Sequence, residues 1–179
     1  VGIMMEDISS HIMDIAMNSV SAGAQRIRVA VEKDPRTAML SLTITDDGVG
    51  MDQETLQKVQ DPFFSTKTGR KVGLGIPLLK GTAETTGGSF EMTSAKGAGT
   101  TIRATFDCRH PDLPPLGKIR DTFLVLVVSH PEVDFDLRYS VDGRSFELDT
   151  EELKRELDGV PVNHPEVISF LGKYLDEHL

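Results

Sequence analysis

A pair of carboxylates followed by two glycines, Asp46-Asp47-Gly48-Val49-Gly50-Met51, stands between an alternating apolar segment and a predicted helix. Glycine lets the backbone approach a bound molecule closely, and a carboxylate at the end of a strand can accept a hydrogen bond from that molecule. The same residue types also form ordinary polar turns. Taken alone, this run therefore leaves a ligand site and a simple turn both open.

A second set of polar residues, Asp7, His11, Asp14 and Asn18, recurs at the spacing of one helix face. A solvated helix surface is one interpretation of such a stripe. A functional interpretation is also open, because an Asn amide oxygen is a hard ligand suited to magnesium. Asp14, one turn before Asn18, would then orient a water or a substrate hydroxyl.

A second glycine cluster, Gly73-Leu74-Gly75-Ile76-Pro77, runs directly into a predicted helix. Free backbone N–H groups at a helix start, together with the positive end of the helix dipole, bind phosphate. The cluster does not match the P-loop, which needs Gly-Lys-Ser/Thr after four intervening residues. Simple packing of the helix start is the alternative explanation.

Hydrophobic periodicity predicts the elements that would position these residues. Helices are expected over 6–20, 52–60 and 77–86, and strands over 25–32, 39–45, 89–94 and 100–106, with a loop over 63–72. This order predicts an α+β layered sandwich.

A stretch with three prolines, residues 109–117, predicts a stiff connector between a domain at 5–108 and a small α/β module at 118–179. Within the module, 119–129 favours a helix, although its β-branched residues also fit a strand. The Asp142-Gly143 turn predicts a hairpin. Helices are expected to start at Thr150 and at Asn163 or His164, before Pro165.

Composition excludes several classes of function. The formal net charge of -9 disfavours nucleic acid as the main partner, because phosphate backbones are bound by clustered Lys and Arg. The longest apolar run, 123–128, is too short to span a bilayer, and the N-terminus lacks the features of a signal peptide. We therefore expect a cytoplasmic protein without membrane association. The single Cys108 provides neither an internal disulfide nor a thiolate metal cluster.

Four motifs in order resemble the ATP-binding domain of the gyrase, heat-shock chaperone, histidine kinase and mismatch-repair (GHKL) superfamily. They are an Asn box at 14–24, a glycine box at 46–51, a Phe-rich segment at 61–67 and a second glycine box at 73–76, closed by Gly97-Ala98-Gly99-Thr100. The histidine kinase-like ATPases are the most similar branch, because Asp-Pro-Phe-Phe-Ser-Thr-Lys followed by Gly-Leu-Gly is their lid pattern. The resemblance implies a Bergerat-type fold, a two-layer sandwich in which helices cover one face of a mixed sheet.

At the adenine end, the resemblance implies that Asp46 accepts the amino group of the base, with Thr100 supporting it through water. Gly48 and Gly50 would pass beneath the base, and Met51 belongs to the same nucleotide-binding set. The neighbouring Asp47 is expected to be a turn residue that faces solvent.

At the phosphate end, the resemblance implies that Asn18 holds a magnesium ion that bridges the phosphates. Gly73 and Gly75 would approach the phosphates, and Leu74 between them belongs to the same nucleotide-binding set. Lys67 on the lid would be the charge partner of the terminal phosphate. Arg70 and Lys71 are weaker candidates for that charge, with a solvated lid surface as the alternative.

The sequence departs from the superfamily at three places. Asp14 stands where the catalytic acid is usually Glu, one methylene longer, and Lys71 stands where the second glycine box usually opens with a further glycine. The sequence also leaves no room for a helical hairpin with a phospho-acceptor His ahead of the Asn box. His11 does not replace that acceptor, because it lacks the surrounding acidic and basic residues, and we expect it at the pocket edge or the surface.

These features predict a magnesium-dependent ATP-binding protein, a kinase or ATPase of signal transduction that transfers phosphate to a separate protein partner, as anti-sigma serine kinases do. The module at 118–179 would recognise that partner, cover the sheet or form a homo-oligomer. The alternative is an ATP-controlled conformational switch with slow or no catalysis. A further resemblance, through Val160-Pro-Val-Asn-His-Pro-Glu166, is to ATP-binding proteins associated with iron hydrogenase systems, which would tie the switch to redox chemistry.

Overall fold

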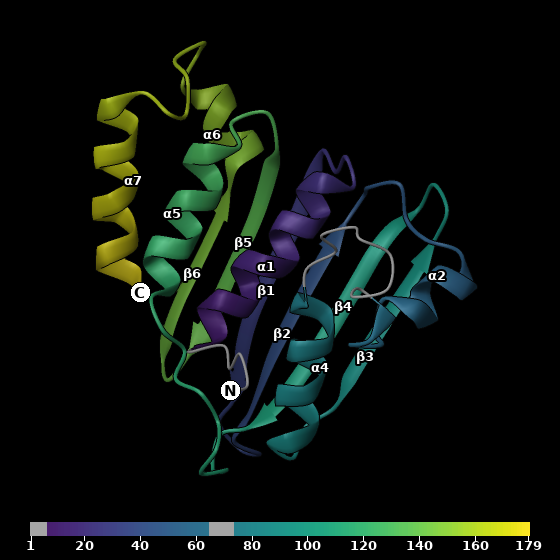
Figure 1. Cartoon of the computed structure of the whole chain (residues 1–179). Helices are drawn as coiled ribbons and strands as arrows, with labels where there is room; N and C mark the ends of the chain where they lie inside the picture. Colours follow the sequence, from purple (N-terminus) through teal and green to yellow (C-terminus); the bar gives the residue numbers. More distant parts are fainter. Residues whose placement is uncertain (1–6, 65–73) are drawn as a thin grey trace.

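The computed structural model describes residues 7–64 and 74–179, which form a mixed sheet with helices on one face (Figure 1). The strands are β1 (Arg26–Asp34), β2 (Met39–Asp46), β3 (Phe90–Ala95), β4 (Gly99–Asp107), β5 (Asp134–Val141) and β6 (Arg144–Asp149). The helices are α1 (Ile8–Ser21), α2 (Gln53–Lys58), α4 (Gly75–Thr85), α5 (Ile119–Ser129), α6 (Thr150–Glu156) and α7 (Pro165–His178).

The six strands follow the order β3-β4-β2-β1-β5-β6. Every neighbouring pair is antiparallel except β1 with β5, which is parallel, so the sheet is mixed. Helices α1, α4 and α5 lie across one face of this sheet, and α7 packs against α5 (Figure 1). The predicted α+β class and the two-layer arrangement are confirmed.

Alternation along the strands explains why the helices in the described part of the chain cover one face of the sheet. Ile27, Val29 and Val31 of β1 are fully buried beneath α1, while the residues between them point to the other face. The matching surface of α1 buries Ile12 and Ala16 completely. Each fully buried Val or Ile side chain contributes roughly 1.5–3 kcal/mol, so this contact fixes α1 on the sheet.

The C-terminal segment, residues 118–179, extends the same sheet. Strand β5 pairs with β1 from Arg26 opposite Asp134 to Glu32 opposite Ser140, and α5 contacts α1. The buried side chains of both parts form one continuous core. The predicted connector is itself bound to the fold, because Pro115 and Leu116 accept hydrogen bonds of 2.9 Å from the first N–H groups of α1. A division into domains at 109–117 stays a prediction.

The predicted elements agree with the structure within a few residues, and 119–129 is the helix α5. Helix α4 begins two residues before the predicted start at Pro77. The reason is that the first four N–H groups of a helix have no partner within it, so proline is tolerated throughout the first turn. Helix α6 begins at Thr150, as predicted, and Asp149 caps it by accepting the Glu151 N–H. The predicted loop at 63–72 falls mostly outside the described residues.

Candidate functional site

A cavity of about 520 Å³ lies between α1 and the neighbouring ends of β2, β3 and β4. Residues predicted from the sequence to bind a nucleotide contribute to its lining: Asn18, Asp46, Gly50, Met51 and Thr100. Apolar side chains form much of the remaining wall: Ile15, Val49, Val59, Ile76, Met92 and Ile102. A mostly apolar pocket with a few convergent polar groups is suited to a flat aromatic ring that carries hydrogen-bonding atoms.

The carboxylate of Asp46 is fixed at the edge of this cavity. The Ser19 hydroxyl donates to Oδ2 at 2.6 Å, and the Gly48 N–H donates to Oδ1 at 2.9 Å. One donor on each oxygen sets the plane of the carboxylate, and each ionised oxygen keeps a further lone pair for a ligand. Asp46 is thus an oriented hydrogen-bond acceptor.

Ser19 was missed by the sequence analysis, although a signal was present. It falls on the apolar stripe of α1, in helical register with Ile8, Ile12 and Ile15, and it is 3% exposed. A buried hydroxyl needs a hydrogen-bond partner, and Asp46 supplies it. A polar residue on an otherwise apolar helix face was the available clue.

Thr100 lies opposite Asp46 in the β2–β4 pairing, so the two side chains share one end of the cavity. Its hydroxyl lies 2.9 Å from the Ser94 hydroxyl, which donates to the Gly99 carbonyl and accepts the Met51 N–H at 2.8 Å. Ser94 therefore joins the loop after β2 to the β3–β4 hairpin, and the sequence analysis also missed it.

The glycines after β2 are required by close backbone packing. Gly50 has φ +67°, and a Cβ there would lie 1.9 Å from the Ala95 carbonyl oxygen. A Cβ on Gly48 would lie 2.9 Å from the Ala22 carbonyl oxygen. The passage of Gly48 and Gly50 beneath a base stays a prediction, whereas their contacts with α1 and the hairpin are part of the fold.

The polar stripe of α1 is not a solvated face, and that interpretation was wrong. His11 is fully buried against α4, with Nε2 lying 3.2 Å from the Thr82 hydroxyl, so its expected place at the pocket edge or the surface was also wrong. Burial lowers the pKa of His11 to about 4. Asp7 caps the start of α1 by accepting the Ser10 N–H.

Asp14 is half-buried where α1 meets the start of α4. A Cβ on Gly75 would lie 3.0 Å from the Asp14 Cβ and 3.4 Å from its Oδ2, so Gly75 permits this close approach. Burial raises the pKa of Asp14, so its carboxylate is a stronger base than an exposed one. Asp14 lies outside the set of described residues that line the cavity.

The phosphate end is described only in part. Leu74 occupies the N-cap position of α4, without a side-chain hydrogen bond to the helix, and Gly75 is the first helical residue. Lys67, Arg70, Lys71 and Gly73 lie outside the described residues. Their predicted roles stay predictions.

A sequence model of the family described as histidine kinase-, DNA gyrase B-, and HSP90-like ATPase matches residues 3–110. The chain belongs to this family. The match contains the whole Asn box, both glycine boxes and the closing Gly97–Thr100 segment, and residues 118–179 lie beyond it.

Several curated bacterial relatives match about half of the chain. The Non-motile and phage-resistance protein of Caulobacter vibrioides is 34% identical over 96 residues, which are 51% of this chain and 11% of the relative. Sporulation kinase B of Bacillus subtilis is 32% identical over 104 residues, 55% of this chain and 24% of the relative. Sensor histidine kinase ZraS of Escherichia coli is 27% identical over 91 residues, 51% of this chain and 19% of the relative. The chain thus spans at most about a quarter of the length of these relatives.

Among solved structures, the Aquifex aeolicus MutL ATPase domain complexed with ADP matches with a TM-score of 0.51 and 16% identity, over 87% of this chain and 68% of that one. This likeness shows a shared fold. No helix in the described parts of the chain combines the length and the apolar character needed to cross a membrane.

Proposed function

We propose that the chain binds ATP in the 520 Å³ cavity, with the adenine amino group donating to Asp46. The observation that carries this proposal is the oriented Asp46 carboxylate, held by Ser19 and Gly48 at the edge of an apolar-walled pocket. The family assignment supports it independently. The similar MutL ATPase domain is complexed with ADP, which is consistent with the same class of ligand.

Magnesium would enter with the nucleotide. In the described residues there is no cluster of three or more His, Cys, Asp or Glu that would hold a metal ion without a ligand. Magnesium needs few protein ligands when phosphate oxygens and waters complete its octahedron, and the amide oxygen of Asn18 in the cavity wall fits that requirement. The bound ion would neutralise phosphate charge.

The proposed reaction is transfer of the terminal phosphate to a separate protein. Asp14 would act as the base, since its carboxylate is half-buried beside the start of α4, where phosphate-binding N–H groups are expected. Lys67, with Arg70 and Lys71 as further candidates, would neutralise the terminal phosphate. Kinases among the curated relatives support this class of chemistry.

Calorimetric titration with ADP and with ATP plus magnesium tests the binding site. We expect Asp46→Ala to weaken ADP binding about 10- to 100-fold, because a hydrogen bond to a charged group contributes about 1.5–3 kcal/mol. Glu54→Gln, which changes an exposed carboxylate on α2, is the matched control and should bind ADP like the unmodified chain. Failure of the unmodified chain to bind either nucleotide would overturn the proposal.

A second function, an ATP-controlled binding module with slow catalysis, is favoured by the place of Asp14 outside the cavity lining. Labelled ATP, magnesium and a cell extract separate the two functions, because a labelled partner protein is expected only for the kinase. Asp14→Asn should abolish that label while ATP binding persists. Partner regulation that survives Asp14→Asn unchanged would select the switch.

A further inference from the structure

The second carboxylate of the opening motif, Asp47, joins the cavity loop to the start of β1. It is exposed, as expected, but its Oδ1 accepts the N–H groups of Gln25 and Arg26 at 2.8 and 2.9 Å. Asp47 is therefore more than a turn residue. It holds residues 25–26 next to the loop that follows Asp46 at the end of β2.

The segment that Asp47 holds is continuous with the cavity wall. Ala22, three residues before Gln25, lines the cavity, and its carbonyl accepts the Val49 N–H at 3.0 Å. Gly48 packs tightly against the same carbonyl. A shift at the start of β1 would therefore displace Ala22 and Val49. It would also move the Gly48 N–H that orients Asp46.

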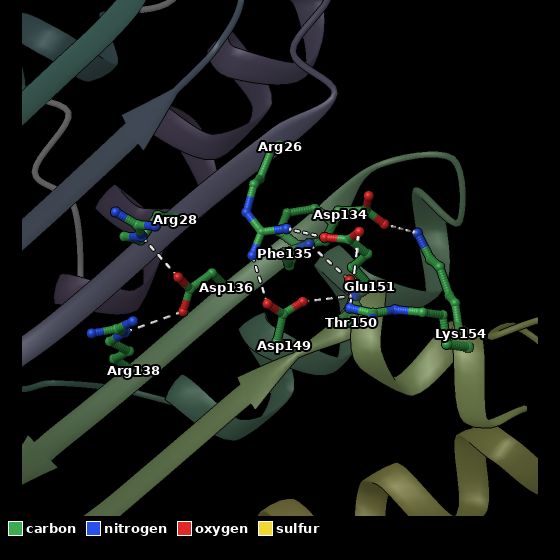
Figure 2. Close-up of polar contacts among 11 residues, drawn as sticks. Arg26, Arg28, Asp134, Phe135, Asp136, Arg138, Asp149, Thr150, Glu151 and Lys154 are labelled. Carbon is green, nitrogen blue, oxygen red and sulfur yellow. Dashed lines mark hydrogen bonds and ion pairs between the residues drawn. The ribbon is translucent and has the colours of Figure 1, made fainter.

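On its other side, the start of β1 is held by the C-terminal segment. The Arg26 guanidinium bridges Asp149 at 2.6 Å and Glu151 at 2.7 Å (Figure 2). The Gln25 carbonyl accepts the Asp134 N–H at 2.8 Å. Both backbone and side-chain contacts thus tie residues 25–26 to β5, β6 and α6.

The C-terminal end of this contact is itself well held. The buried Thr150 hydroxyl accepts the Phe135 N–H at 2.8 Å, and Lys154 donates to the Val133 carbonyl at 2.9 Å and to Asp134 at 2.6 Å (Figure 2). Burial opposes ionisation of Asp149, but hydrogen bonds from Arg26 and the Glu151 N–H outweigh it and lower its pKa. Arg26 therefore pairs with a carboxylate, Asp149, that is itself held by the Glu151 N–H.

On the basis of the proposed nucleotide binding, we propose that the C-terminal segment sets adenine affinity through Arg26. Arg26 is a positioning residue. Held by Asp149 and Glu151, it fixes residues 22–26, which together with Asp47 hold the Asp46 loop in its binding geometry. The segment beyond the family match would thereby regulate the nucleotide site without touching the nucleotide.

Arg28 provides a matched control in the same strand. It also joins β1 to β5, through Asp136 at 2.7 Å, and Asp136 keeps a second partner in Arg138 (Figure 2). Arg28 lies two residues further from the loop, and none of its hydrogen bonds involves Asp47 or Ala22. The same chemical change at the two arginines therefore separates loop positioning from the general stability of the sheet.

The experiment measures ADP and GDP affinity of the full chain by calorimetry, alongside thermal unfolding. We expect Arg26→Gln to weaken ADP binding about three- to tenfold and to reduce the preference for ADP over GDP, with Arg28→Gln within about twofold of the unmodified chain. Arg26→Lys, which can reach only one carboxylate, should fall between them. Asp149→Asn keeps an α6 cap, and combined with Arg26→Gln it should add no further loss of affinity.

Equal effects of Arg26→Gln and Arg28→Gln on ADP affinity would overturn the inference. So would unchanged ADP affinity in Arg26→Gln, whether or not the unfolding temperature falls. Lack of ADP binding by the unmodified chain would instead overturn the proposed function, so the two failures are distinguishable.

Discussion

At the scale of single residues, the candidate site depends on the polar groups that orient Asp46, and α1 carries His11 and Asp14 against α4. Ser19 and Asp46 are 27 positions apart in sequence, yet their side chains share a 2.6 Å hydrogen bond. His11 and Asp14 show a related effect, because contact with α4 removes water from both and shifts their pKa values in opposite directions. Protein surroundings, more than residue type, set the chemistry of this helix.

Removal of the Ser19 hydroxyl should loosen Asp46. We expect Ser19→Ala to lower ADP affinity about fivefold to tenfold, because the carboxylate loses one orienting donor worth roughly 1 kcal/mol. Calorimetry measures the change. Ser21→Ala is the control, since Ser21 also lines the cavity and makes no hydrogen bond to Asp46. An equal loss in both variants would contradict the role of Ser19.

Burial of neutral His11 should make stability depend on pH. Its pKa is about 4 when folded and 6.5 ordinarily, so between these pH values the unfolded chain binds the extra proton and stability falls as pH decreases. The loss approaches about 3 kcal/mol by pH 4. His11→Leu should reduce the pH dependence of the free energy of unfolding between pH 6.5 and 4, as measured by urea titration.

The difference in free energy of unfolding between the unmodified chain and His11→Leu cancels the contributions of all other titratable groups that the two chains share. The raised pKa of Asp14 acts in the opposite direction, because the folded chain then binds the proton more readily, but it is present in both. Carboxylates with lowered pKa, such as Asp52 and Asp107 at about 2, lose their stabilising effect mainly below pH 4. An equal slope for both chains between pH 6.5 and 4 would refute the assignment to His11.

At the scale of elements, the sequence predicted the helices and strands well because their apolar periods are regular. The alternation of β1 and β2 and the apolar stripe of α1 each identify one buried face. The contacts between these elements were harder to predict from the sequence. Three such contacts join segments that are distant in sequence: Ser94 with Met51, Gly75 with Asp14, and Asp47 with Arg26. Secondary-structure propensity is a local property and does not predict them.

Gly50 tests the packing between the cavity loop and the β3–β4 hairpin. We expect Gly50→Ala to destabilise the fold by at least about 2 kcal/mol, because positive φ strains a non-glycine residue and the new Cβ meets the Ala95 carbonyl. Gly97→Ala in the same hairpin has a similar φ of +78° but open space around the Cβ, so about 1 kcal/mol is expected there. Denaturant unfolding measures the loss of stability in each variant. Equal losses would show that the Ala95 carbonyl does not clash with a Cβ at position 50.

At the scale of the whole molecule, the parallel pairing of β1 with β5 joins the family domain and the C-terminal segment in one sheet with one core. Helix α5 covers part of α1, and its Phe123 is fully buried. A proline-rich stretch suggested a boundary, but the residues that follow it return to the sheet beside β1. The segment therefore has a structural place next to β1 and the loop after β2.

Residues 5–108 produced alone should be less stable than the full chain. Their β1 would expose a long unpaired edge, and α1 would expose the apolar surface that α5 covers. We expect a lower midpoint of thermal unfolding, followed by circular dichroism, and faster amide exchange in β1. Equal unfolding temperatures for the two chains would show that 109–117 separates independent domains.

The sequence by itself determined the family and the order of the elements, and it predicted Asp46 and Asn18 as site residues, because spaced motifs and apolar periods are local properties of the chain. Tertiary structure alone decided that Ser19 donates to Asp46, that Ser94 accepts the Met51 N–H, that His11 is buried and that Arg26 joins the C-terminal segment to Asp47. Each of these depends on which segments meet across the sheet. That is set by the burial of whole faces and by strand register, which no single segment specifies.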